Sequence, residues 1–137
     1  HVSLEAARHL ALHCELHVDR VLVTVNPDDA LLRAISSLNA ISHLQVHGVR
    51  DAARLHQIRG LSHKDLIVGV DVATRDDVYA ALGLEDVASH VLLDSKSNGH
   101  GGSGASFDWA LLDGAHFKKP WFLAGGLTRD NVTEAIA

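Results

Sequence analysis

The stretch LLDSKSNGHGGSGASFDW, residues 92–109, says more about the fold class than any other part of the chain. A carboxylate, Asp94, ends an apolar run, and a loop with four glycines and a new amphipathic segment follow it. This order is typical of parallel-sheet enzymes, in which reactive side chains lie at the carboxyl ends of strands and neighbouring glycine loops bind phosphate. The sequence WFLAGGLT at 121–128 repeats the strand-glycine-helix order, so two consecutive units favour the same fold class.

Predicted strands and helices alternate along the whole chain. Apolar or β-branched runs predict five strands, at 20–25, 43–47, 65–70, 89–94 and 120–124. Helices are predicted at 3–16, from Asn26 as the cap with Pro27 as the first helical residue, at 51–58, 74–83 and 107–112, and from Thr128 onward. Strands separated by helices imply right-handed crossovers and a parallel sheet. The alternation alone fits both an incomplete eightfold βα barrel and an open, doubly wound sheet.

Length and composition exclude several classes of protein. The 137 residues fit a single domain, 1–137, and the net charge of -5 with scattered Lys and Arg argues against a nucleic-acid partner. No apolar run approaches the roughly 20 residues that span a bilayer, so no membrane partner is expected. Cys14 is the only cysteine, which favours a cytoplasmic location. Its place among leucines and alanines of a helix predicts a small buried side chain rather than a nucleophile.

The ends of the chain are unusual. The sequence contains no methionine, begins at His1 and stops at Ala137 inside a helical pattern. We therefore expect a piece of a longer protein.

The first candidate for chemistry is Asp94. A carboxylate beside a glycine loop at the mouth of a strand could donate a proton, or it could simply cap the loop that follows. Gly101, Gly102 and Gly104 could turn backbone amides toward an anion, or form an ordinary surface turn.

The Gly125-Gly126 pair is the stronger anion candidate. Two glycines between a strand and a predicted helix start at Thr128 would bring free N–H groups and the helix dipole to one point.

The histidines give weaker signals. Gln45 and His47 alternate along one predicted strand and therefore share a face, with His47 near its end. His9, His13 and His17 recur every four residues, but no acid or cysteine is grouped with them, so no metal site is expected.

Three groups of residues together resemble phosphoribosylanthranilate isomerase, a βα-barrel family of tryptophan biosynthesis. They are LQVHG at 44–48, LLDS at 92–95 with GGSG at 101–104 and FDW at 107–109, and LAGGL at 123–127 with NV at 131–132. The resemblance covers essentially the whole chain and implies a parallel (βα)8 barrel, here incomplete, with about five strands running from the family's second helix to its seventh.

The resemblance also implies a reaction. The family carries out an Amadori rearrangement of a phosphorylated anthranilate ribosylamine, using a general acid and a general base and no cofactor or metal. Asp94 matches the general acid. The implied substrate-binding residues are Gln45, His47, Gly101, Gly102, Gly104, Ala124, Gly125 and Gly126.

The sequence also departs from the family pattern. Nothing matches the cysteine base of the family's first strand, Cys14 lies in the wrong element, and the arginine that binds the anthranilate carboxylate would precede His1. The chain alone is therefore expected to be inactive. Unpaired edge strands predict poor solubility or self-association, and the intact protein is expected to be a monomer or homodimer.

Two other functions stay open at this point. One is the related barrel isomerase of histidine biosynthesis, or a dual-substrate form, which typically has two aspartates at strand ends. The other is a phosphate-binding module without catalysis.

Overall fold

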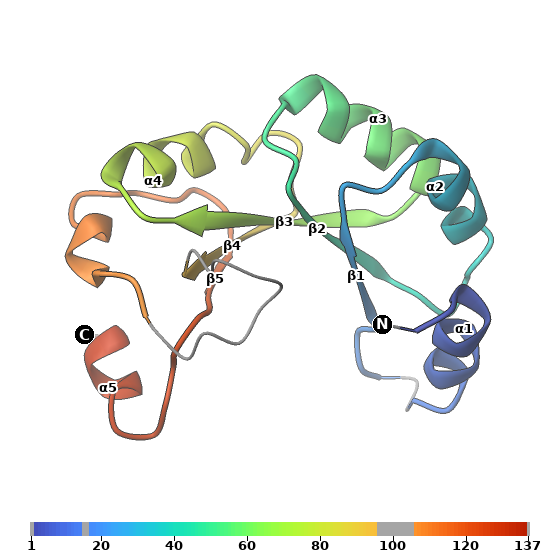
Figure 1. The fold of residues 1–137 in the computed structure, drawn as a ribbon, viewed down its shortest axis with the longest axis horizontal. Helices are drawn as coiled ribbons and strands as arrows, with labels where there is room; N and C mark the ends of the chain where they lie inside the picture. The colour runs from blue at the N-terminus through green and yellow to red at the C-terminus, as the bar shows by residue number, and fades with distance from the viewer. Residues whose placement is uncertain (1, 15–16, 96–105, 137) are drawn as a thin grey trace.

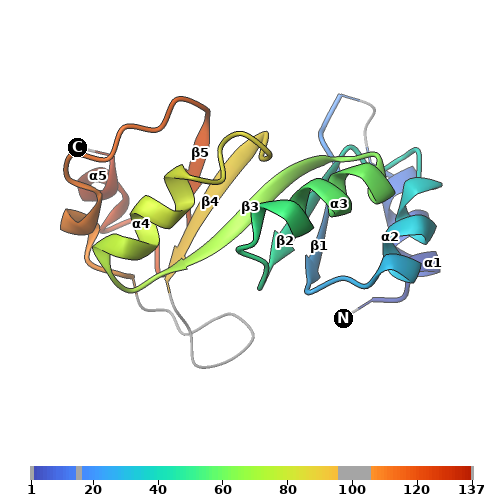
Figure 2. The same cartoon turned by 90° about the horizontal axis from the view of Figure 1, so that it is seen from above.

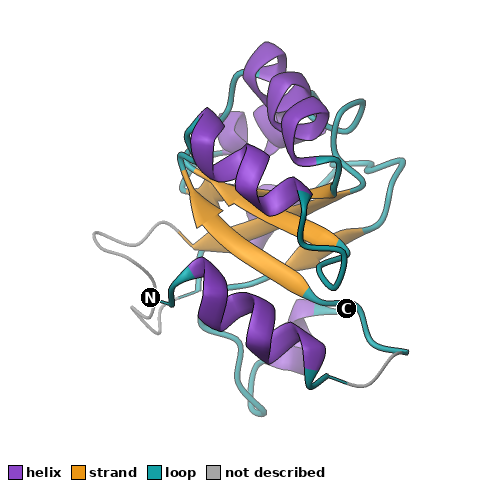
Figure 3. Ribbon diagram, turned by 90° about the vertical axis from the view of Figure 1, so that its right-hand side faces the viewer, coloured by secondary structure: helices purple, strands orange, loops and turns teal. Residues whose placement is uncertain are grey.

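The computed structural model describes residues 2–14, 17–95 and 106–136, and shows one curved parallel sheet with helices along its outer side (Figure 1). The strands are β1 (Val21–Val25), β2 (His43–His47), β3 (Asp65–Val72), β4 (His90–Ser95) and β5 (Trp121–Leu123). The helices are α1 (Leu4–Leu12), α2 (Asp29–Ser36), α3 (Ala52–Ser62), α4 (Arg75–Leu82) and α5 (Val132–Ala135), with a 3-10 helix η1 (Trp109–Leu112). Helices lie above and below the strands in Figure 3 because the sheet bends and they follow it.

The strand order decides between the two folds that the alternation allowed. The order in space is β1-β2-β3-β4-β5, all parallel, the same as the order in the chain. A doubly wound sheet reverses direction at a switch point, whereas a barrel adds each strand on the same side of the last. The sheet therefore winds as a barrel does. The barrel is not closed in the described part of the chain, where β1 and β5 form the two ends of the sheet (Figure 2).

The two faces of the sheet differ in burial. On β3, alternate residues point under the helices: Leu66, Val68, Val70 and Val72 are 0%, 0%, 1% and 1% exposed. Fully burying such a side chain contributes about 1.5–3 kcal/mol. On β2 and β4 the residues between the buried ones are only half-buried. We call this uncovered side the inner face, because it corresponds to the inside of the incomplete barrel.

Side chains of the loops determine where the helices begin. Asp51 caps α3 by accepting from the backbone N–H groups of Ala53 and Arg54, and Thr74 forms a capping box with Asp77 at α4. The predicted cap of α2 is wrong. Asp28, not Asn26, accepts from an amide of the first turn, and Asn26 has a φ of 44° in the left-handed region. The chain turns at Asn26 before the helix can begin.

The prediction for the first helix is also partly wrong. It ends at Leu12, and residues 15–16 lie outside the described part of the chain. Ala7 and Ala11 are buried, but Leu10 is 60% exposed and Cys14 is exposed rather than packed in a core. The reason is position: α1 flanks β1, an end strand, and only one side of the helix is covered. No described helix is both long and apolar enough to cross a bilayer.

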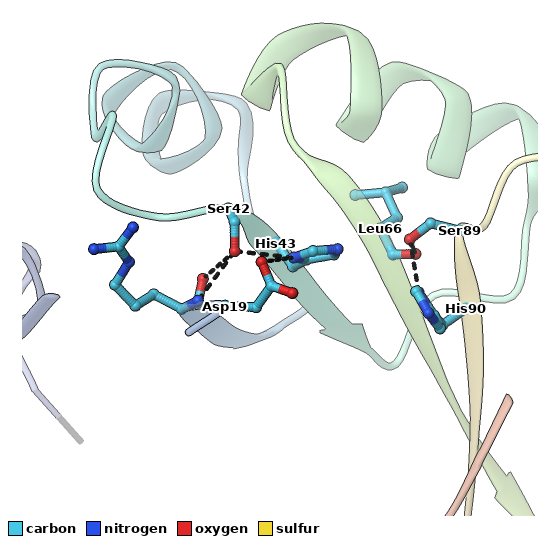
Figure 4. Close-up of polar contacts among 7 residues, drawn as sticks. Asp19, Ser42, His43, Leu66, Ser89 and His90 are labelled. Atoms are coloured by element: carbon cyan, nitrogen blue, oxygen red, sulfur yellow. Dashed lines mark hydrogen bonds and ion pairs between the residues drawn. The ribbon is translucent and has the colours of Figure 1, made fainter. Parts of the chain in front are cut away.

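Two Ser-His pairs organise the amino end of the sheet (Figure 4). The Ser89 hydroxyl donates to the Leu66 carbonyl at 2.7 Å and contacts His90 Nδ1 at 3.2 Å. Ser42 repeats the arrangement two crossovers earlier, at the start of β2, donating to a carbonyl before β1 at 3.2 Å and contacting His43 Nδ1 at 3.0 Å. Each pair therefore joins the start of its strand to the start of a preceding strand.

Candidate active site

The carboxyl end of the sheet brings together the residues that the sequence predicts for chemistry. Asp94 is the next-to-last residue of β4 and lies half-buried on the inner face. His47 is the last residue of β2, on the same face. β3 lies between these strands, and Asp94 is two residues further along the sheet than the level of His47, so their backbones are about 12 Å apart.

Gly125 packs directly against Asp94. A Cβ built on Gly125 would lie 2.7 Å from Asp94 Oδ1 and 2.7 Å from the Ser95 backbone nitrogen, and would also overlap the Ser95 hydroxyl. The φ of Gly125 is 86°, a region that disfavours side chains for a second reason. The Ala124 N–H donates to the Leu93 carbonyl at 2.8 Å, which holds this turn against β4. Only glycine fits beside the acid.

The predicted helix start after the glycine pair is wrong. Gly126 has the expected positive φ, 63°, but α5 begins at Val132 and has four residues. Asn131 fills the interval: its Oδ1 accepts from the Thr128 N–H at 2.7 Å, and its Nδ2 donates to the Gly126 carbonyl at 2.9 Å. The turn is therefore stabilised by an asparagine side chain, and the Thr128 amide is not free.

Gln45 and His47 interact with each other on the inner face. Gln45 Nε2 lies 2.8 Å from His47 Nε2. The His47 ring extends over the backbone of Gly69 in β3, where an added Cβ would lie 2.6 Å from Nδ1 and 2.8 Å from Nε2. The sequence predicted the shared face, whereas the contact with Gly69 depends on cross-strand register.

Asp71 of β3 is a second carboxylate at this end of the sheet, and it was not among the residues predicted from the sequence. It lies directly opposite Asp94 in the register of β3 and β4 and is exposed. The apolar run predicts a strand that ends at Val70, whereas β3 continues to Val72 and places Asp71 on the sheet. The sequence could have indicated this position, because Gly69 and Asp71 are two residues apart and therefore lie on the same, inner face of the strand.

Arginines join consecutive loops at this end of the sheet. Arg54 binds Asp29 at 2.7 Å and the Pro27 carbonyl at 2.8 Å. Arg50 binds Asp77 at 2.7 Å and the Asp71 carbonyl at 2.8 Å.

The third arginine of this set follows β3. Arg75 donates to the carbonyls of Asp113 and Ala110, each at 3.0 Å. Each of the three therefore reaches from one βα unit to a neighbouring one, and together they hold the loops around the candidate site.

Asp77 is the ionisable group that this arrangement perturbs most. Hydrogen bonding from Arg50 holds the pKa of the Asp77 carboxyl well below its ordinary value of 3.8. The backbone amides of Ala73 and Thr74 act in the same direction, while partial burial opposes them.

The sequence also predicted roles for three loop glycines and considered a series of histidines on the first helix. Gly101, Gly102 and Gly104 are outside the described residues. The rings of His9, on α1, and His13, its C-cap, have centroids 4.4 Å apart and planes tilted by 36°. In the described ranges, no three His, Cys, Asp or Glu side chains are grouped to hold a metal ion.

Comparisons with known proteins identify the family. The family model described as N-(5'-phosphoribosyl)anthranilate (PRA) isomerase matches residues 1–137. The chain belongs to the phosphoribosylanthranilate isomerase family. The isomerase of Paracoccus denitrificans is 39% identical over 99% of this chain and 65% of its own length. That of Beijerinckia indica is 39% identical over 100% of the chain and 64% of its own length.

Solved isomerases share the fold. The phosphoribosylanthranilate isomerase of Thermotoga maritima superposes with a TM-score of 0.83 at 30% identity, over 99% of this chain and 65% of the other. An isomerase in complex with reduced 1-(O-carboxyphenylamino)-1-deoxyribulose 5-phosphate superposes with a TM-score of 0.78 at 26% identity, over 99% and 63%. The chain thus spans just under two thirds of the length of these relatives.

Proposed function

We propose that the protein to which this chain belongs is a phosphoribosylanthranilate isomerase of tryptophan biosynthesis. The observation that carries the proposal is the packing of Gly125 on Asp94 at the carboxyl end of the sheet, in a member of this family. Barrel enzymes place their chemistry at this end. The substrate is then N-(5-phosphoribosyl)anthranilate and the product 1-(2-carboxyphenylamino)-1-deoxyribulose 5-phosphate.

Asp94 acts as the general acid in this proposal. It transfers a proton to the furanose oxygen as the bond from that oxygen to C1 breaks and the nitrogen lone pair forms a Schiff base. A base then takes the C2 proton, and the resulting enolamine tautomerises to the ketone. No redox partner or cofactor is needed, because the hydrogen lost at C2 is balanced by the one gained at C1.

The base is not assigned within this chain. The family resemblance gives that role to a cysteine in a strand preceding this stretch, and Cys14 is an exposed residue after α1. The 137 residues by themselves are therefore proposed to be inactive.

The remaining roles follow the geometry. Gly125 and Gly126, with positive φ, would turn backbone amides toward the phosphate, next to Ala124. His47 would line the pocket from β2. Gly101, Gly102 and Gly104 keep their proposed phosphate role from the resemblance alone. A cytoplasmic monomer or homodimer is proposed for the intact protein.

One observation favours a second candidate, a dual-substrate isomerase that also serves histidine biosynthesis. Asp71 lies in register with Asp94, so two aspartates are present at neighbouring strand ends. In the single-substrate reading, Asp71 is a solvated carboxylate.

The test is turnover of both substrates by the protein expressed from its complete gene. Asp94→Asn should lower kcat for phosphoribosylanthranilate by about 10² to 10⁴-fold, because the amide cannot donate the acid's proton. Asp71→Asn is the matched control and should change kcat by less than about threefold. This corresponds to a much smaller change in activation free energy than the loss of a general acid. Near-normal turnover in Asp94→Asn would remove Asp94 from the mechanism. The second candidate would be favoured if the parent protein turned over the histidine-pathway substrate and Asp71→Asn abolished that activity.

A further inference from the structure

The His47 ring is in contact with two residues, Gln45 of the same strand and Gly69 of β3. Gln45 lies two residues earlier on the same strand and face, and its side-chain amide reaches up to Nε2 at 2.8 Å. Gly69, on the neighbouring strand β3, has no side chain and so leaves room for the ring edge that carries Nδ1 and Nε2. No other hydrogen bond to this ring is found among the described residues.

We propose that Gln45 is a positioning residue, which fixes His47 as the tautomer with its proton on Nδ1 while Gly69 provides the space for the ring. The amide nitrogen of Gln45 has only protons to offer, so Nε2 must accept and be unprotonated. The neutral imidazole then carries its single proton on Nδ1. His47 can therefore present an N–H donor to an oxygen of the substrate.

This inference deepens the proposed function and rests on it for the identity of the ligand. Gln45 then acts on the substrate through His47, in addition to the substrate-binding role that the family resemblance implies for it. In histidines generally, the hydrogen bond made by one ring nitrogen determines which nitrogen carries the proton. Here the neighbour is a neutral amide, so the choice adds no charge to the site.

The contact with Gly69 offers a way to move the ring without removing the amide. A Cβ at Gly69 would lie 2.6 Å from His47 Nδ1, so the ring must shift. The clashing atoms are the end of a rotatable side chain, so the protein can accommodate the change with little loss of stability. Gly60, on α3, is the matched control, because a Cβ there meets nothing within 4 Å.

The first experiment reads the tautomer directly in the protein expressed from its complete gene. Long-range proton–nitrogen NMR spectra at about pH 8, where an ordinary imidazole is neutral, distinguish the two tautomers. The His47 signals are assigned by their loss in His47→Asn. We expect the Nδ1–H form in the parent protein, its loss in Gln45→Leu, and a shift to the Nε2–H form in Gln45→Glu, whose carboxylate accepts. Gln57→Leu, on exposed α3 surface where Gln57 accepts from Arg54 at 3.3 Å, should leave the His47 tautomer unchanged. A parent His47 protonated on Nε2 would overturn the proposal.

The second experiment measures kinetics of the same protein with phosphoribosylanthranilate. Gln45→Leu and Gly69→Ala should each raise KM by about five- to tenfold with kcat within about twofold, as expected for one mispositioned hydrogen bond. Gly60→Ala should match the parent. A lower melting temperature with unchanged KM and unchanged tautomer would make Gln45 merely structural and overturn the proposal. Absence of turnover in the parent protein would refute the proposed function, while the NMR result would still decide the tautomer.

Discussion

The two ends of the sheet are built from similar residue types and differ in how those residues are held. At the amino end, His43 and His90 each contact a serine whose hydroxyl is bound to a backbone carbonyl. At the carboxyl end, His47 is contacted by a glutamine side chain and faces a glycine.

The difference teaches where function can reside in such a sheet. A histidine bound through serine to the backbone contributes to the joining of strands. A histidine held by another side chain, above a glycine and beside an arginine-joined set of loops, joins no strands and lies where we propose that the substrate binds. The chemistry of the residue is the same, and its neighbours determine its use.

Breaking the carboxyl end at Gly125 should have the largest effect. Gly125→Ala introduces a Cβ 2.7 Å from Asp94 Oδ1 at a positive φ, so we expect the acid to be displaced. Turnover of phosphoribosylanthranilate should fall by about 100-fold or more, as for loss of a positioned acid.

Gly114→Ala separates the two causes of this loss. Gly114 also has a φ of 77°, but a Cβ there meets nothing within 4 Å. Its substitution should cost stability of about 1 kcal/mol, measured by urea unfolding, and leave turnover unchanged. Equal activity losses in both variants would show that backbone strain, rather than contact with Asp94, explains the first result.

The second prediction concerns acid. Because the pKa of Asp77 is lowered in the folded protein, its ionised form stabilises the fold above its ordinary pKa of 3.8, and that stabilisation is lost as the pH falls below this value. Asp77→Asn should therefore be less stable at neutral pH, by about 1–2 kcal/mol for a lost cap and ion pair, and should depend less on pH below about pH 4.

The measurement is urea unfolding between about pH 2 and pH 7, a range in which carboxyl groups titrate. Asp76→Asn, the neighbouring exposed carboxylate of α4, is the control. A parent and an Asp77→Asn protein with parallel pH profiles would contradict the assignment of acid sensitivity to this end of the sheet.

The smallest effects are expected at the amino end. Ser89→Ala removes a hydroxyl that donates to the Leu66 carbonyl, yet the Ser89 N–H donates to that same carbonyl and remains. The melting curve should report a loss of about 0.5–1.5 kcal/mol, with kcat and KM unchanged. Ser42→Ala should cost more stability, because the Ser42 hydroxyl also accepts from the Arg20 N–H at 3.0 Å, and should likewise leave kcat and KM unchanged. A change in KM would mean that the two ends are coupled.

Much of the fold could be predicted from the sequence. The runs at 43–47 and 65–70, and the Asp at the end of 89–94, reflect local patterns that the structure preserves within a few residues. The choice between barrel and doubly wound sheet could not be made from the alternation, because it depends on which side each strand joins its predecessor.

The position of a candidate site residue could be predicted only where it follows from that residue's own strand. Asp94 and His47 belong to this class. Asp71 was missed because its importance comes from the register with β4, and Gly69 because its role is to leave space for a ring on β2. The Asn26 cap failed since several polar residues compete for the same turn, and tertiary contacts select one of them.

The arginine contacts at the carboxyl end determine how many loops would have to be exchanged together if this protein were remodelled. Arg50 belongs to one loop, while the carboxylate and carbonyl that it binds belong to the next unit. Arg75 likewise binds carbonyls of the next unit, whereas Arg54 binds a carboxylate and a carbonyl of the preceding one. A single loop transplanted from a relative would leave an arginine behind or arrive without one, so the natural module for exchange is a pair of consecutive loops.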